Sequence, residues 1–343
     1  MSSISWFSEV GIHDRPTVGG KGGSLGELTG AGIAVPPGFV VTTHAFEQFL
    51  EALEAREPVR SKVENVDPAD LGAVTALSEE LRRRVVEEAM PAEVEQAILE
   101  AHAKLGANAV AVRSSATTED AEDASFAGLQ DTFLWVLDGA DTVRRVRECW
   151  GSLYSVESIT YRCKHAFPED GVAMAVVVQQ MVDARCAGVM FTRSPTTGDK
   201  SVITIEGAWG LGSAVVSGEV TPDRWVMGKI TGEISVRDIS HKHAKQVPAD
   251  GGGIVEVELE AAEADAPCLT DAELQALREV GRRIERHYGK PQDIEWALDK
   301  SGKILLLQSR PETVWSAKDT APVTKPEADP LKHVMGIFAG GRR

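Results

Sequence analysis

The chain has 343 residues, 43% of them hydrophobic and 26% charged, and its 36 Lys and Arg against 52 Asp and Glu give a net charge of −16. This composition is typical of a globular protein of about two domains, and the acidic balance argues against broad binding of nucleic acid or of an anionic membrane surface. No secretion signal and no bilayer-length apolar run occur, and the four cysteines are too irregularly spaced for a zinc cluster. We therefore expect a cytoplasmic protein with reduced thiols and no membrane contact.

The first segment that suggests chemistry is residues 18–28, which are dense in glycine and surround Lys21. Glycine permits positive φ and lets backbone N–H groups close on a phosphate, while the lysine adds a point charge. The segment matches neither the Walker P-loop nor the dinucleotide fingerprint. It predicts a phosphate-binding loop, and a flexible surface loop is the alternative.

A helix over 91–105 and a strand over 109–112 are the next predicted elements, and the strand delivers Arg113 to its end. Hydroxyl residues and then a glycine-containing loop follow. A guanidinium at the end of a strand can fork onto phosphate oxygens, and nearby hydroxyls extend the same anion site. The alternative is an ion pair between Arg113 and Glu119 or Asp120.

Further strands are predicted over 173–178, 202–205 and 304–307, and a long helix over 271–288. Thr270 and Glu273 form a capping box for this helix, and Gly289 ends it. Long helices between separated strands indicate α+β or α/β layers. From residue 316 the sequence turns to prolines and charges, which is typical of a linker or a docking tail.

Residues 293–298 and 303–310 predict a hairpin that places Glu295 and Gln308 on one face, with Arg310 on the same face. The opposite face is expected to be apolar and to hold Ile294, Trp296, Leu305 and Leu307. A carboxylate, an amide oxygen and a guanidinium on one face suit Mg²⁺ held between protein oxygens and substrate phosphates. The alternative is an exposed polar hairpin face.

These three candidate sites lie far apart in the sequence, so they can form one site only in a two-lobed cleft. Five motifs in order resemble the N-terminal nucleotide-binding domain of the phosphoenolpyruvate synthase family: VGGKGGSLGEL with PPGFVVT, AVRSSATTEDAEDASFAGLQDTFLWV, QQMV, GAWGLGSAVVSGEVTPD, and DIEWALD with LLLQSRPET. The wider group includes pyruvate phosphate dikinase, rifampin phosphotransferase and phenylphosphate synthase. The resemblance covers residues 18–313.

The resemblance implies an α+β fold of the ATP-grasp type, whose N-terminal lobe (1–175) and C-terminal lobe (176–315) enclose ATP, followed by the tail (316–343). It also implies functional residues. Lys21, Arg113 and Arg310 would be catalytic, the first two on the ATP phosphates and Arg310 on the transferring phosphoryl. The resemblance further implies phosphate-covering positions at Gly128, Gln130 and Thr132, adenine and hinge positions at Gln180, Met181 and Val182, and Mg²⁺ ligands at Glu295 and Gln308. The glycines near Lys21 and Gly128 are expected to act as a lid that closes on ATP.

The sequence also departs from this family. Ser213 stands where the family usually has Glu, so the role of this position is open. Family members pass the phosphoryl group to a histidine on a mobile domain, and neither His44 nor the pair His241 and His243 has that motif. The chain is therefore either a fragment of a longer enzyme or a natural subunit, and we expect an ATP-binding subunit that phosphorylates a histidine on a separate partner subunit.

Two acceptor classes and one different kind of function remain open at this point. In the expected enzyme, the partner passes the phosphoryl to a small acceptor, for which a phenol is preferred by analogy with phenylphosphate synthase. The alternatives are part of a phosphoenolpyruvate synthase or of an antibiotic phosphotransferase. A non-catalytic ATP-binding module is the competing function, and binding of nucleic acid is not expected.

Overall fold

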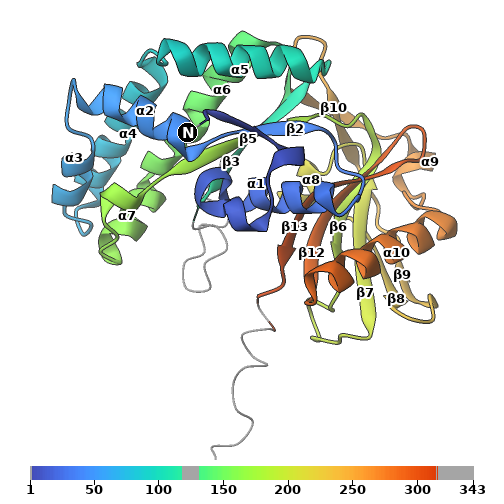
Figure 1. Cartoon of the computed structure of the whole chain (residues 1–343). Coiled ribbons are helices and arrows are strands. Elements are labelled where there is room, and N and C mark those ends of the chain that lie inside the picture. Colours follow the sequence, from blue (N-terminus) through green and yellow to red (C-terminus); the bar gives the residue numbers. More distant parts are fainter. Residues whose placement is uncertain (1, 118–130, 314, 316–343) are drawn as a thin grey trace, which may run out of the picture.

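The computed structural model describes residues 2–117, 131–313 and 315 and shows two lobes of mixed helix and sheet (Figure 1). The first lobe holds a five-stranded sheet in the order β1-β2-β5-β3-β4, and the second holds a six-stranded sheet in the order β13-β12-β6-β7-β8-β9. The predicted α+β class with two lobes is confirmed. The expected tail (316–343) and the residues Gly128, Gln130, Glu119 and Asp120 lie outside the described residues.

The sheet of the first lobe lies between two layers of helix. Its strands are β1 (Ile4–Trp6), β2 (Gly38–Val41), β3 (Val110–Ala116), β4 (Thr132–Val136) and β5 (Met174–Gln180). Its helices are α1 (Arg15–Gly30), α2 (Thr43–Glu54), α3 (Arg60–Asn65), α4 (Leu71–Glu87), α5 (Ala92–Leu105), α6 (Gly139–Gly151) and α7 (Val156–Lys164). Short 3₁₀ segments occur at Phe7–Glu9, Ile12–Asp14, Ser152–Tyr154 and Glu169–Gly171. Successive side chains of a strand point to opposite faces, so the sheet has an apolar cluster on each side. One face packs on α2 and α4 to α7 and the other on α1.

The sheet of the second lobe carries its main helix on one face only. Its strands are β6 (Ala184–Phe191), β7 (Val202–Trp209), β8 (Asp223–Gly228), β9 (Ile234–Asp238), β12 (Gln292–Asp299) and β13 (Ile304–Pro311). Helix α10 (Asp271–Tyr288) buries Leu274, Leu277 and Ile284 against this sheet. A separate pair of strands, β10 (Ala244–Pro248) and β11 (Ile254–Glu258), and two short helices, α8 (Ser213–Val216) and α9 (Ala261–Ala264), complete the lobe.

Local signals that predicted α10 are all present. The side chain of Thr270 accepts a hydrogen bond from the backbone N–H of Glu273, the carboxylate of Glu273 accepts one from the backbone N–H of Thr270, and Gly289 ends the helix with a φ of 68°. Helix α5 likewise ends at a glycine with positive φ, as expected. These helix ends need no tertiary contact, which is why the sequence predicts them well.

The chain passes between the two sheets after β5. Since β5 pairs with β2 and β3, it belongs to the first lobe, and the crossing lies between Gln180 and Ala184. The boundary expected between 175 and 176 falls inside this strand. Residues 181–183 therefore form the covalent connection between the lobes on this side.

The glycine-rich segment around Lys21 is helical, so the expected loop there was wrong, while its part in binding phosphate and in closing on ATP stays a prediction. It lies in α1, which is kinked at Gly19, where φ is 71°. A Cβ atom on Gly19 would overlap the backbone of Ser115, and one on Gly26 would overlap the backbone of Val10. These glycines allow α1 to pack closely on its neighbours, which the sequence pattern alone does not reveal.

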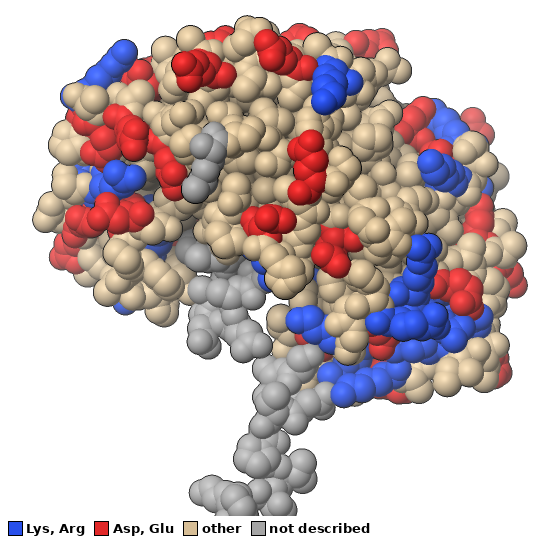
Figure 2. All heavy atoms as spheres, viewed as in Figure 1, with Lys and Arg blue, Asp and Glu red and all other residues tan. Residues whose placement is uncertain are grey.

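Charge is distributed unevenly over the surface. Figure 2 shows Asp and Glu side chains over the helices of the first lobe and a group of Lys and Arg side chains over α10. Part of the charge of this basic group is neutralised within it, because Arg282 pairs with Glu279 and Lys229 with Glu285. Among the helices that the structure describes, none has the length and apolar composition that would be needed to cross a membrane.

Candidate nucleotide site

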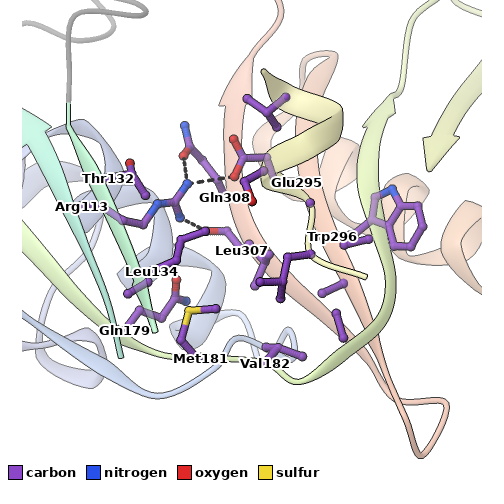
Figure 3. Close-up of a pocket in the computed structure, with 18 of the residues that line it drawn as sticks. Arg113, Thr132, Leu134, Gln179, Met181, Val182, Glu295, Trp296, Leu307 and Gln308 are labelled. Carbon is purple, nitrogen blue, oxygen red and sulfur yellow. Dashed lines mark hydrogen bonds and ion pairs between the residues drawn. The ribbon is translucent and has the colours of Figure 1, made fainter. Parts of the chain in front are cut away.

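A cavity of about 510 Å³ lies between the two sheets and is lined by residues of both lobes. Its volume is in the range of small-molecule sites. One end is polar and is lined by Lys21, Arg113, Thr132, Glu295, Gln308 and Arg310. The other end is mainly apolar and is lined by Ala111, Leu134, Met181, Val182, Leu211, Ala297 and Leu307. Figure 3 shows residues of both ends, Arg113 with Glu295 and Gln308 at one and Met181 with Val182 at the other, between the strands of the two sheets.

Arg113 connects the lobes at the polar end. Its Nη2 atom donates hydrogen bonds to Glu295 Oε2 and Gln308 Oε1, both at 2.8 Å, and its Nη1 donates to the backbone oxygen of Leu307 at 2.9 Å (Figure 3). Only 11% of the Arg113 side chain is exposed. The guanidinium is therefore held by the two side chains that the sequence assigns to a metal ion, while the alternative partners Glu119 and Asp120 lie outside the described residues.

Arg113 does not end its strand, as the sequence suggested, because β3 continues to Ala116. On the face of β3 that carries Arg113, Ser115 is covered by α1: its hydroxyl donates to the backbone oxygen of Val18. Ala111 and Arg113, farther along the same face, line the cavity. Thr132 of β4 is the cross-strand partner of Arg113, so it lies beside the guanidinium-bearing residue at the cavity wall.

The predicted hairpin is present, with Glu295 directly opposite Gln308. A β-bulge follows, because Trp296 pairs with Leu306 and leaves Leu307 as an extra residue. Leu307 consequently lines the cavity, and Leu305 packs beside it in the small apolar cluster that contains Ala297 and Val182 instead of in the main core, which corrects the prediction for these two side chains. The bulge also leaves the Leu307 carbonyl outside the regular ladder, where it can accept from Arg113.

Asp293 is a neighbour of the site residue Arg310 that the sequence reasoning missed. It lies opposite Arg310 in the hairpin, and the Arg310 Nε atom is 3.5 Å from Asp293 Oδ2. Burial raises the pKa of Asp293 to about 6, against the opposing effect of the Arg310 charge. The signal that could have found it is its spacing, since residues two apart on a strand share a face and Asp293 precedes Glu295 by two.

Lys21, on α1, also reaches the polar end of the cavity. Lys21, Arg113 and Arg310 thus bring three cationic side chains to one end of a single cavity. Together with Glu295 they form a mixed-charge site in which positive charge predominates. A concentration of positive charge in a concave site on an acidic protein favours an anionic ligand such as a phosphate chain.

The connection between the lobes forms the apolar end. Backbone hydrogen bonds hold it in place: Gln180 N donates to the oxygen of Pro37 at 2.8 Å, and Met181 N donates to the oxygen of Ala109 at 3.0 Å. Met181 and Val182 then contact the apolar residues of the second lobe, including Leu211. This arrangement suits a flat apolar ligand group near the connection.

The structure brings nearly all sequence-predicted site residues to this one cavity. The residues that line it are Lys21, Arg113, Thr132, Gln180, Met181, Val182, Glu295, Gln308 and Arg310. Gly128 and Gln130 lie outside the described residues. Ser213, whose role the sequence left open, also lines the cavity, at the start of α8.

Comparison with known proteins identifies the family of the chain. Residues 15–330 match the family described as pyruvate phosphate dikinase, AMP/ATP-binding domain. The chain belongs to this family. A probable phosphoenolpyruvate synthase of Methanothermobacter thermautotrophicus is 43% identical over 316 residues, which cover 90% of this chain and 46% of that protein. The phosphoenolpyruvate synthase of Pyrococcus furiosus is 38% identical over 384 residues, covering 98% of this chain and 46% of that protein.

Membership identifies the chain as an ATP-binding domain of the phosphoenolpyruvate synthase and pyruvate phosphate dikinase group, a group of phosphotransferases. The chain spans less than half the length of these two relatives. Among solved structures, an L-amino acid ligase from Bacillus licheniformis matches 80% of this chain and 58% of its own at 13% identity, with a TM-score of 0.25. A TM-score this low supports no conclusion about the present chain.

Proposed function

We propose that this chain binds Mg-ATP in the cavity and donates its phosphoryl group to a histidine in a dikinase-type reaction. The observation that supports this most directly is the meeting of Arg113 from one lobe with Glu295 and Gln308 from the other, at the polar end of a cavity whose opposite end is apolar. A nucleoside triphosphate has the matching polarity. Its base fits beside Met181 and Val182, and its phosphates fit among the cationic side chains.

Magnesium fits the donor atoms at the polar end. Glu295 Oε2 and Gln308 Oε1 both lie 2.8 Å from a single nitrogen of Arg113, so the two oxygens can converge on one cation. One carboxylate and one amide oxygen suit Mg²⁺, which usually completes its shell with water and substrate phosphates. Among the described residues, no group of three or more His, Cys, Asp or Glu could hold a metal ion. When bound, Mg²⁺ would neutralise charge on the phosphates.

The side chains of this chain would act by positioning and by charge. Lys21 and Arg113 would bind the phosphates, which requires Arg113 to exchange its bonds to Glu295 and Gln308 for bonds to phosphate oxygens. Arg310, 52% exposed at the polar end, would stabilise charge on the phosphoryl group as it leaves the nucleotide. Phosphoryl transfer depends mainly on such positioning and charge neutralisation.

The phosphoryl acceptor would come from outside this site. The described residues that line the cavity include no histidine. In the proposed reaction ATP, water and the histidine give AMP, inorganic phosphate and phosphohistidine, so that the histidine keeps one phosphoryl group. A partner subunit would carry this histidine and pass the group to a small acceptor. A phenol is the acceptor we favour from the family analogy, while the names of the relatives favour pyruvate.

The test compares Arg310→Ala with the unchanged chain. Purified protein is mixed with a histidine-bearing partner and ATP labelled at the β-phosphate, and label on the partner and AMP release are measured with either phenol or pyruvate present. We expect Arg310→Ala to lose at least about 100-fold in transfer and only a few-fold in ATP affinity, because this side chain acts on the transition state. Lys300→Ala, in the exposed turn of the same hairpin, is the matched control and should behave as the unchanged chain.

The competing function, a non-catalytic ATP-binding module, makes the opposite prediction. A sensor needs charge only to bind the nucleotide, so Arg310→Ala would reduce binding and any turnover by the same factor. Equal losses in the two measurements, or ATP binding without label on any partner, would refute the enzymatic proposal. Failure of the chain to bind ATP at all would refute both.

A further inference from the structure

Helix α8 forms one wall of the cavity between its two ends. Gly212, Ser213, Val216 and Ser217 line this wall, at the segment whose role the sequence left open. A Cβ atom on Gly212 would lie 3.3 Å from the Cβ of Ala187, so the start of α8 sits directly over β6. Figure 3 draws this short helix in pale yellow on the side of the cavity that holds Glu295.

The strand register shows which part of a nucleotide this wall would meet. Ala187 lies opposite Ala297, at the apolar end, and Val189 lies opposite Glu295, at the polar end. Two residues of a strand span about 6.6 Å. The start of α8, over Ala187, therefore lies at the level of Ala297, about 6.6 Å along the strand from the level of Glu295, where the apolar end adjoins the polar end. In a nucleoside triphosphate that level is occupied by the sugar.

A chain of hydrogen bonds fixes the direction of the Ser213 hydroxyl. The carboxylate of Glu219 can only accept, and it accepts from Gln246 Nε2 at 2.8 Å. This orients the Gln246 amide so that its Oε1 atom faces Ser213 and accepts the hydroxyl proton. The hydroxyl hydrogen of Ser213 is already donated to Gln246, so toward a ligand in the cavity the Ser213 oxygen can only accept a hydrogen bond.

The backbone holds this chain of side chains in place. The backbone N–H of Leu211 donates to the oxygen of Gln246 at 3.1 Å, and Gly210 forms an isolated parallel bridge with Gln246. Gly210 has a φ of 77°, and a Cβ atom there would overlap the Gln246 oxygen. Backbone contacts thus hold the segment 210–213 against β10, and they fix the position of Ser213.

We propose that Ser213 accepts a hydrogen bond from a hydroxyl of the ribose and so makes the site selective for ribonucleotides over deoxyribonucleotides. Gln246 and Glu219 are positioning residues that hold the Ser213 hydroxyl as an acceptor. This inference rests on the proposed ATP site and deepens it, since it names the sugar as a recognised part of the substrate. The 2′- and 3′-hydroxyls share the required chemistry, and the experiment separates them.

Calorimetry of the full chain with ATP, 2′-deoxyATP and 3′-deoxyATP, each with Mg²⁺, tests the proposal. The unchanged chain should bind ATP about 3- to 10-fold more tightly than one of the deoxy analogues, the effect of one neutral hydrogen bond. Ser213→Ala should weaken ATP by the same factor and leave that analogue unchanged. Ser213→Thr keeps the hydroxyl and should keep the preference. Ser217→Ala tests the other hydroxyl of the same wall, and Ser235→Ala, on β9 outside the cavity, is the control.

Each outcome decides the proposal. Equal weakening of ATP and both analogues by Ser213→Ala would show a purely structural role and overturn it. No preference in the unchanged chain, or a preference carried by Ser217, would also overturn it. If none of the variants and not even the unchanged chain binds ATP, the proposed function itself fails, which is a distinct result from ATP binding without discrimination of the sugar.

Discussion

Replacing Asp293 by Asn tests the electrostatics of the site without any ligand. Burial raises the pKa of Asp293 from 3.8 to about 6, although Arg310 lies 3.5 Å away and opposes the shift. The side chain is 22% exposed, and its Oδ1 atom has no hydrogen-bond partner among the described residues. The folded protein therefore holds this carboxylate in surroundings that disfavour its charge.

The sign of the pH dependence follows from this raised pKa. Between pH 3.8 and about 6 the folded state binds more protons at Asp293 than the unfolded state does, so the free energy of unfolding falls as the pH rises through this window. A difference of about two pH units at about 1.36 kcal/mol each gives a loss of up to about 3 kcal/mol above pH 7. Asn cannot ionise, so Asp293→Asn avoids this loss.

The assay is urea unfolding of both proteins from pH 4 to pH 8, with EDTA and without nucleotide. We expect equal stability near pH 4 and an Asn variant up to about 3 kcal/mol more stable at pH 8. Asp299→Asn, at the turn of the same hairpin, is the control of opposite sign. Hydrogen bonds from the side chain of Ser301 and the backbone of Lys303 lower the pKa of Asp299, so its replacement should cost stability as the pH rises above that lowered value. A stability difference for Asp293→Asn that does not change with pH would refute the reasoning.

Three further predictions follow from contacts described above. Arg113→Met should weaken ATP binding by at least about 10-fold. It should also tighten Mn²⁺ binding to the nucleotide-free protein, because it frees the oxygens of Glu295. Electron paramagnetic resonance measures free Mn²⁺, and weaker Mn²⁺ binding would contradict the prediction. Gly188→Ala should cost several kcal/mol, since its Cβ would overlap the backbone of β7, and an unchanged Tm would contradict this. Lys242→Met should cost about 3 to 5 kcal/mol in urea unfolding because it leaves the fully buried Asp223 carboxylate without its ion pair, and an unchanged free energy of unfolding would contradict this.

The sequence predicts best the elements that local chemistry decides. The bounds of α10 follow from its capping box, its apolar stripe and Gly289, all of which act within the helix. The pairing of Glu295 with Gln308 follows from the arms of one hairpin. The predicted strand at 109–112 was too short because Arg113 and the hydroxyl residues after it are polar, yet they continue β3 where both of its faces are covered.

Features that depend on contacts between distant segments were not predictable in this way. The glycines of α1 allow close approach to Ser115 and Val10, and a loop and a tightly packed helix can have the same glycine content. The bulge at Leu307 depends on how the two hairpin arms align across the cavity, so alternation alone placed Leu305 and Leu307 on the wrong face. The convergence of three remote motifs was expected from the family resemblance, whereas their local patterns left structural alternatives open.

The extra residue in β13 lengthens one arm of the hairpin by one residue, so its presence can be read from the number of residues in that arm. Without it, Glu295 and Gln308 would still lie opposite each other, but the carbonyl that accepts from Arg113 belongs to the extra residue and would be lost. Homologous sequences with an equally long arm should retain this bond across the cleft, and those shorter by one position should join their halves through side chains alone. The number of residues between the hairpin turn and the position of Gln308 thus distinguishes homologues whose lobes are joined by a side chain and a backbone carbonyl from those joined by side chains alone.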